Sequence, residues 1–211
     1  MGQIDWNKVV EYYIRIKEYY ILCEETDPEL KTNLQPLNEF RAALDHTMRI
    51  IAITNTTIGN NVNIDADAEY TKLISHLKRA YYDICDMLSI NYRNKIVDTL
   101  EIYDPEIIRA AIPNYYSDIR PMIEKYSEKI ATLREQKGID KDGADKRMQT
   151  YQEIVEGLRA QYDKIKDALP VLEELKSKQK KAKQKDFISK FVVPIASIAI
   201  GAILSIIGFL V

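Results

Sequence analysis

Apolar residues recur every three or four positions along much of this chain, and this spacing constrains the fold most. The clearest run comprises Tyr70, Leu73, Leu77, Tyr81, Ile84, Leu88 and Tyr92. Such spacing places the residues on one face of an α-helix. Similar runs at 5–25, 36–53, 114–137 and 144–172 predict further helices, and only seven Gly and seven Pro are present to interrupt them. We therefore predict an all-α bundle of about five helices.

The second of these runs predicts which side of its helix faces the core. Its stripe contains Leu37, Phe40, Leu44, Met48 and Ile51. The last run, from Ile154 to Leu172, is close to a heptad repeat and contains Pro170, which we expect to bend the helix. We expect this helix to connect the bundle to the end of the chain.

The end of the chain, 191–211, has no charged residue. A helix of that length spans roughly 31 Å, close to the bilayer core of about 30 Å. The lysines just before it are Lys180, Lys181, Lys183, Lys185 and Lys190. Lysines gather on the cytoplasmic side and attract anionic lipid head groups. We therefore expect a tail-anchored, single-pass membrane protein with three parts: a cytoplasmic bundle (1–137), a connecting helix with the lysines (138–190) and a transmembrane helix (191–211).

Small residues recur within this apolar end, at Ser197, Gly201, Ser205 and Gly208. A stripe of small residues lets membrane helices approach closely. The sequence thus predicts a homo-oligomer, whose serines either hold the helices together or line a pore. A simple anchor would need neither.

Charge is unevenly distributed along the chain. Residues 176–190 hold seven lysines and one acid, and the remainder has 23 basic and 31 acidic residues, or about −8. A surface of that sign argues against broad nucleic-acid binding.

Catalytic and cofactor motifs are scarce. The sequence contains no phosphate-binding glycine loop and no nucleophile elbow, and it has only two histidines and two isolated cysteines. We expect no cofactor, no metal and no enzymatic activity, with both cysteines as free thiols.

Two His-x-x-Arg motifs suggest a ligand site. Arg41, His46 and Arg49 lie in one predicted helix, and His76 and Arg79 lie in the next. Neighbouring antiparallel helices would bring them together, and such a pocket would favour an anionic nucleotide or oligonucleotide. The alternative is two solvated faces with local ion pairs.

The stretch RAALDH, Arg41 to His46, resembles the Arg-x4-His motif of the HEPN superfamily, small helical bundles that often cut RNA. The resemblance implies Arg41 and His46 as transition-state and acid–base groups. It covers six residues, and Ala42 stands where that family usually has a polar residue.

The layout of bundle, long helix, lysines and apolar end resembles two classes of protein. One is the small membrane effectors of bacterial anti-phage systems, such as the Hailong-type channel effector, in which a helical domain senses a nucleotide. The other is the syntaxin-type SNAREs. The sequence-based hypothesis is a homo-oligomeric, ligand-regulated membrane effector, such as an ion channel, in prokaryotic antiviral defence. The alternatives are a membrane-tethered HEPN-like ribonuclease and a SNARE-like or adaptor tether.

Overall fold

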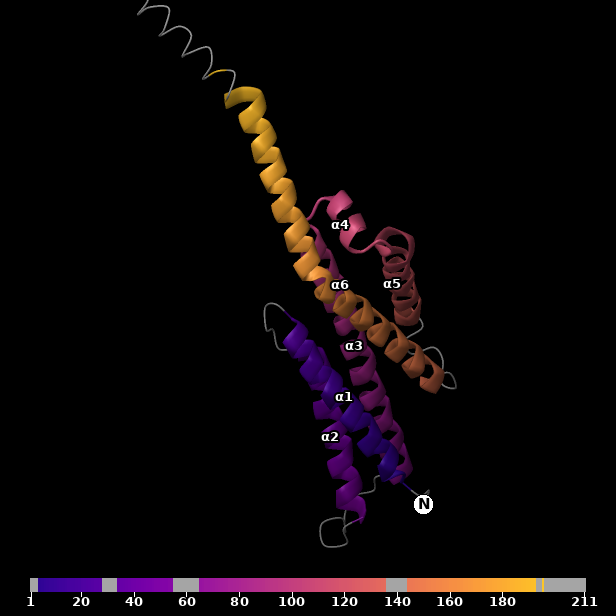
Figure 1. The fold of residues 1–211 in the computed structure, drawn as a ribbon. Helices are drawn as coiled ribbons and strands as arrows, with labels where there is room; N and C mark the ends of the chain where they lie inside the picture. Colours follow the sequence, from indigo (N-terminus) through magenta and orange to yellow (C-terminus); the bar gives the residue numbers. More distant parts are fainter. Residues whose placement is uncertain (1–3, 28–33, 55–64, 136–143, 193–194, 196–211) are drawn as a thin grey trace, which may run out of the picture.

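Six α-helices make up most of the described chain (Figure 1). The computed structural model describes residues 4–27, 34–54, 65–135, 144–192 and 195. The helices are α1 (Trp6–Thr26), α2 (Leu34–Thr54), α3 (Ala66–Leu100), α4 (Pro105–Ala111), α5 (Arg120–Glu135) and α6 (Ala144–Phe187). Two π-helical segments occur as well: η1 (Tyr115–Ile119) leads into α5, and η2 (Ile188–Val192) continues α6. The described residues contain no strand, so this part agrees with the all-α prediction.

Local sequence signals set several helix starts. The Asp5 side chain accepts a hydrogen bond from the Lys8 backbone N–H at 3.2 Å, and Asp65 accepts one from the Asp67 N–H at 3.0 Å. These carboxylates satisfy N–H groups that lack a partner within the helix. Pro105 opens α4, where its missing N–H costs little.

The helix α3 is the centre of the fold. It packs against α1, α2, α5 and α6, and fifteen of its 35 residues are buried. The part of α6 up to Leu172 contributes Tyr151, Ile154, Leu158, Ile165 and Leu172 to the same core. The predicted connecting helix is therefore a core element over most of its apolar run.

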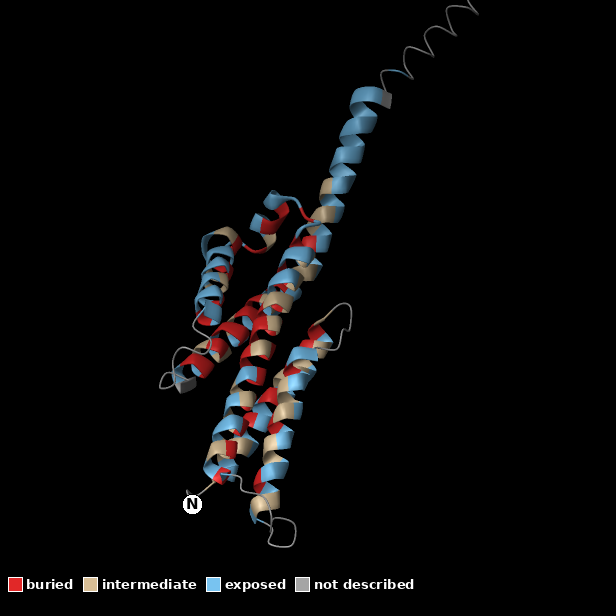
Figure 2. Cartoon of the chain, turned by 180° about the vertical axis from the view of Figure 1, so that it is seen from behind, coloured by how far each residue is buried: buried red, intermediate tan, exposed pale blue. Residues whose placement is uncertain are grey.

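Beyond Leu172, α6 runs out of the bundle. Figure 2 shows its last turns exposed on all sides, and every residue from Lys180 to Phe191 is exposed. The last described contacts with the bundle are at the α3–α4 turn, where Tyr103 donates a hydrogen bond to Glu173 and Lys183 lies 3.3 Å from Asp104. Beyond Lys183, the described part of the helix projects away from the other helices.

The predicted core stripe of α2 is wrong. Leu37, Leu44, Met48 and Ile51 are exposed, and only Phe40 of that stripe packs against the core. The buried residues of α2 are Pro36, Ala43 and Ile50. The reason is that α2 is apolar on two sides, so spacing alone could not show which side faces α3.

No helix within the described residues is long and apolar enough to cross a bilayer. This finding contradicts the predicted transmembrane helix, and with it the membrane-protein, tail-anchored and single-pass assignments and the cytoplasmic placement of the bundle. The last described turns of α6 and η2 still contain Lys185, Asp186 and Lys190, and charged side chains are costly in hydrocarbon. Of the predicted span, 193–194 and 196–211 lie outside the described residues.

Candidate functional site

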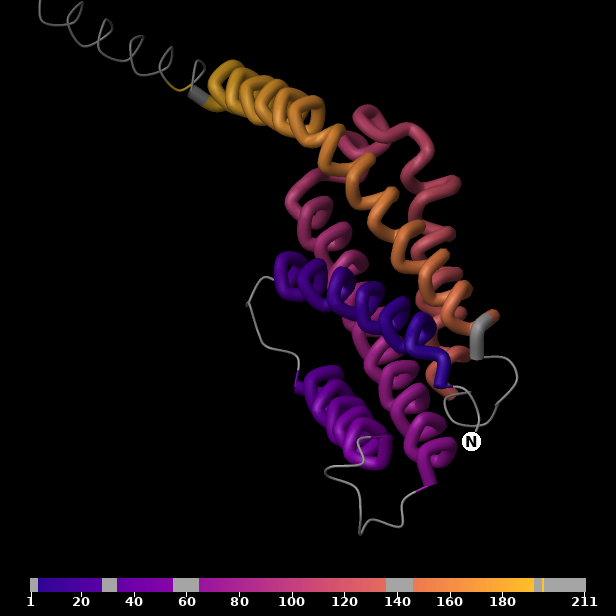
Figure 3. Tube along the Cα trace, turned by 90° about the horizontal axis from the view of Figure 1, so that it is seen from below, coloured from indigo at the N-terminus to yellow at the C-terminus, as the bar shows by residue number. Residues whose placement is uncertain are grey.

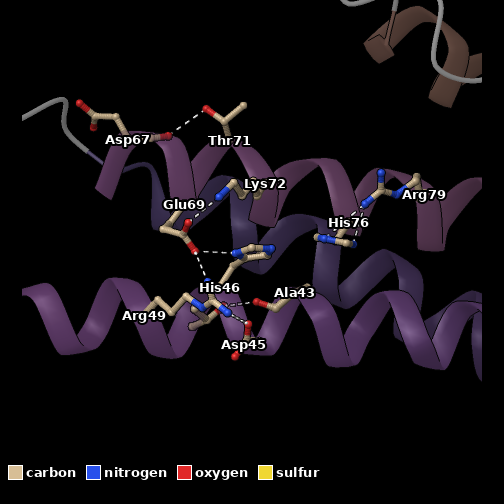
Figure 4. Close-up of polar contacts among 11 residues, drawn as sticks. Ala43, Asp45, His46, Arg49, Asp67, Glu69, Thr71, Lys72, His76 and Arg79 are labelled. Carbon is tan, nitrogen blue, oxygen red and sulfur yellow. Dashed lines mark hydrogen bonds and ion pairs between the residues drawn. The ribbon is translucent and has the colours of Figure 1, made fainter. Parts of the chain in front are cut away.

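The two histidines of the chain meet between α2 and α3 (Figure 4). The imidazole rings of His46 and His76 are stacked, with centroids 5.1 Å apart and ring planes 23° from parallel. His46 Nδ1 lies 2.6 Å from Glu69 Oε2, and His76 Nδ1 lies 2.7 Å from Glu39 Oε2. Because an ionised carboxylate only accepts, the contact with Glu69 favours a proton on His46 Nδ1. His76 Nδ1 also lies 2.7 Å from a guanidinium nitrogen of Arg79, which only donates, so the two contacts of His76 favour opposite tautomers.

The contacts cross between two copies of one short pattern. Residues 39–49 read EFRAALDHTMR and residues 69–79 read EYTKLISHLKR, so each has Glu-x6-His-x2-Arg. The glutamate of each copy pairs with the histidine of the other helix. Two antiparallel helices carrying one pattern bring these groups together twice, and the result is a pseudo-symmetric polar cluster.

Cationic side chains surround both glutamates. Lys72 Nζ lies 2.8 Å from Glu69 Oε1, and Arg49 lies 3.8 Å from Glu69 Oε2 and 2.7 Å from Asp45. Arg79 Nε donates to Glu39 Oε2 at 2.9 Å. The hydrogen bonds from Lys72 and His46 lower the pKa of Glu69 from its ordinary 4.5 to about 2. Glu69 therefore stays ionised across the physiological range.

The structure brings together four of the five residues predicted to bind an anion: His46, Arg49, His76 and Arg79. Each of the four already has a carboxylate partner, Glu39, Glu69 or Asp45. A charge-balanced cluster attracts phosphate less than the cationic pocket that we expected. Anion binding stays a prediction. The sequence analysis missed Glu39 and Glu69, although the repeated seven-residue interval to each histidine could have indicated them.

Arg41 lies apart from this cluster. It is exposed on α2, whereas His46 points to Glu69 on α3 with only 12% of its side chain exposed. Five residues along a helix correspond to about 140° around its axis. Within the described structure, the two residues of the HEPN-like motif therefore lie on different faces of α2, and ribonuclease activity stays a prediction without a shared site for them.

An apolar groove runs between α1 and α2. Both helices pack on α3, and Figure 3 shows them as separate rods beside it. The groove has a volume of about 590 Å³. Its lining is Val9, Val10, Tyr13, Lys17, Tyr20 and Ile21 from α1, Leu37, Phe40, Ala43, Leu44 and Thr47 from α2, and Leu73 and Leu77 from α3. Nearly all of these side chains are apolar, and they lie directly beside the helix that carries His46.

The remaining predicted residues lie at the other end of the chain. Lys180, Lys181, Lys183, Lys185 and Lys190 are exposed on α6 and η2. The small-residue stripe of Ser197, Gly201, Ser205 and Gly208 lies outside the described residues. In the part of the chain that is described, no group of three or more His, Cys, Asp or Glu is arranged to hold a metal ion. Cys23 and Cys85 are both buried, and neither forms a disulfide within the described residues.

The chain matches no protein-family model, no curated protein and no solved structure. The resemblances to Hailong-type effectors, HEPN ribonucleases and SNAREs therefore gain no support from relatives. The features of the described chain that bear on function are the groove, the polar cluster and the exposed end of α6.

Proposed function

We propose that this chain is a self-associating helical scaffold, whose α1–α2 face pairs with the same face of a second copy. The observation that carries the proposal is that the apolar surface of α2 extends beyond the side that packs on α3. One side packs on α3 through Pro36, Ala43 and Ile50. The other exposes Leu34, Leu37, Leu44, Met48 and Ile51. Five large apolar side chains exposed on one helix form a surface patch, and a patch of this kind marks an interaction site.

The spacing of the exposed residues favours another helix as the partner. Leu34, Leu37, Arg41, Leu44, Met48 and Ile51 alternate intervals of three and four, as the a and d positions of a heptad repeat do. One polar residue among them, Arg41, is the kind of substitution that sets register in coiled coils. This repeat supports pairing by knobs-into-holes packing along most of α2.

Self-pairing fits the charges on this face. If two α2 helices run antiparallel about a two-fold axis, each a position meets a d position of the other copy. Arg41 then lies beside Leu44 and Asp45 of the second copy. Arg41 and Asp45 have opposite charges, so the antiparallel register brings complementary groups together at the centre of the seam. The groove between α1 and α2 widens the apolar surface available to the second copy.

The test is the molar mass in solution, by light scattering across a range of protein concentrations. We expect wild type to be a dimer or a higher even-numbered assembly. Met48→Glu places an unpaired carboxylate against Leu37 of the second copy and should weaken association at least about a hundredfold. The matched control is Ile102→Glu, because Ile102 is 55% exposed and Met48 is 52% exposed. A monomeric wild type, or equal effects of the two variants, would overturn the proposal.

A further inference from the structure

The projecting end of α6 differs in charge from the rest of the molecule. Residues 176–190 have seven lysines and one acid, on a chain whose remainder is acidic. Four of these lysines have described contacts with acids or an aromatic ring: Lys176 lies over the Tyr103 ring, and Lys178, Lys183 and Lys190 lie near Glu174, Asp104 and Asp186. The three ion pairs are solvent-exposed and hold their lysines weakly. These cations can therefore turn toward an external anionic surface.

Large apolar side chains are exposed beside these lysines. Phe187 is 58% exposed and Phe191 is 55% exposed, and their rings lie 5.3 Å apart between centroids, so both are on one side of the helix. Ile188 is exposed next to them. Lys180 and Lys183 precede Phe187 by seven and four residues, and Lys190 follows it by three, which are same-face intervals on a helix. One side of this helix end thus combines phenylalanines with lysines.

We infer that this end of α6 and η2 binds an anionic lipid surface, with the lysines on the head groups and the phenylalanines in the interfacial layer. Aromatic and aliphatic side chains flanked by lysines are the features of helices that lie at a lipid–water interface. Nucleic acid is the other polyanion to consider. Exposed Phe and Ile side chains favour lipid over a phosphate backbone, which offers them no apolar phase. This contact is made by described residues and lies at the head-group surface, so it needs no helix that crosses a bilayer. It does not depend on the pairing of α2 helices proposed above.

The experiment uses a fluorescent reporter in the full chain. Trp6 is the only tryptophan, so Trp6→Phe with Phe187→Trp makes emission report on position 187 alone. We expect a blue shift with vesicles that contain phosphatidylglycerol and little shift with pure phosphatidylcholine. Salt should reverse the shift, because it screens the lysines.

Two variants of the reporter chain separate the contribution of the lysines to vesicle binding from that of the phenylalanines. Lys180→Gln, Lys183→Gln and Lys190→Gln together should weaken partitioning about a hundredfold, since each lysine near an anionic surface contributes about fivefold. The matched control neutralises three exposed lysines elsewhere, at Lys125, Lys129 and Lys146, and should change little. Phe191→Ser should reduce partitioning about tenfold and keep its salt dependence.

Three outcomes would overturn the inference. The first is equal partitioning of the reporter on neutral and anionic vesicles. The second is an equal loss in the two lysine triples, which would indicate a general charge effect. The third is a blue shift of the same size with single-stranded RNA as with anionic vesicles, which would make this end a nucleic-acid surface.

Discussion

The helices α2 and α3 pack against each other and have similar apolar spacing, yet they are buried to very different extents. α3 buries fifteen of its 35 residues, including Leu73, Ile84 and Leu88, whereas α2 buries three of 21. Other helices cover α3 on several sides, while α2 contacts the described bundle chiefly through α3. The difference shows that apolar spacing indicates which faces of a helix can be buried, and that the neighbouring helices determine which of those faces is buried. The apolar face of α2 that stays exposed is the basis for proposing a second copy.

The largest expected effect contrasts one leucine from each helix. Leu88 of α3 has no exposed surface, so Leu88→Ala leaves a cavity and should lower the free energy of unfolding by about 3 kcal/mol. Leu44 of α2 is exposed, so Leu44→Ala should change it by less than about 0.5 kcal/mol in dilute protein. Urea unfolding followed by circular dichroism measures both. Similar losses would mean that α2 is buried in the single chain as α3 is.

The second comparison is between a buried carboxylate on α3, Glu69, and an exposed one on α2. The pKa of Glu69 gives the sign of the pH dependence of the unfolding free energy. Because that pKa is lowered from 4.5 to about 2 in the folded chain, the stabilisation is present above pH 4.5 and is lost as the pH falls to 2. We expect Glu69→Gln to lower the unfolding free energy by roughly 1–2 kcal/mol at neutral pH and to flatten its slope within this window. Thermal unfolding between pH 2 and pH 6 measures the slope.

The control for this variant is Asp45→Asn on α2. Its carboxylate is 58% exposed and pairs with Arg49, so the change should cost little at any pH. A slope in Asp45→Asn as flat as that in Glu69→Gln would show that the acid sensitivity comes from general charge and not from the polar cluster.

The sequence predicted the parts of the fold in which apolar residues occupy one face. The stripe from Tyr70 to Tyr92 marked α3 correctly, because most of its members have a single direction in which to be buried. The same rule failed for α2, since Leu44 and Ala43 are adjacent and either face could have been the inner one. The cross-pairing of Glu39 with His76 needed the tertiary arrangement, because these residues are 37 positions apart. The repeated Glu-x6-His-x2-Arg pattern was visible in the sequence, but only the antiparallel packing explains it.

The smallest expected effect is that of Arg49→Gln, which separates folding from binding. The Arg49 side chain is 47% exposed, and its contact with Glu69 is 3.8 Å long. Its pair with Asp45 is a surface pair at four-residue spacing, and such pairs contribute about 0.3–0.5 kcal/mol. We therefore expect the unfolding free energy to change by no more than about 0.5 kcal/mol, far less than in Glu69→Gln.

Because Arg49→Gln should barely change stability, it can test the anion site predicted from the sequence without unfolding the chain. If that site exists, Arg49→Gln should weaken pyrophosphate binding about ten- to a hundredfold in calorimetric titration, since one charge-assisted contact is lost. Unchanged binding, or no heat from wild type, would leave the cluster with a packing role alone, holding α2 to the central helix α3.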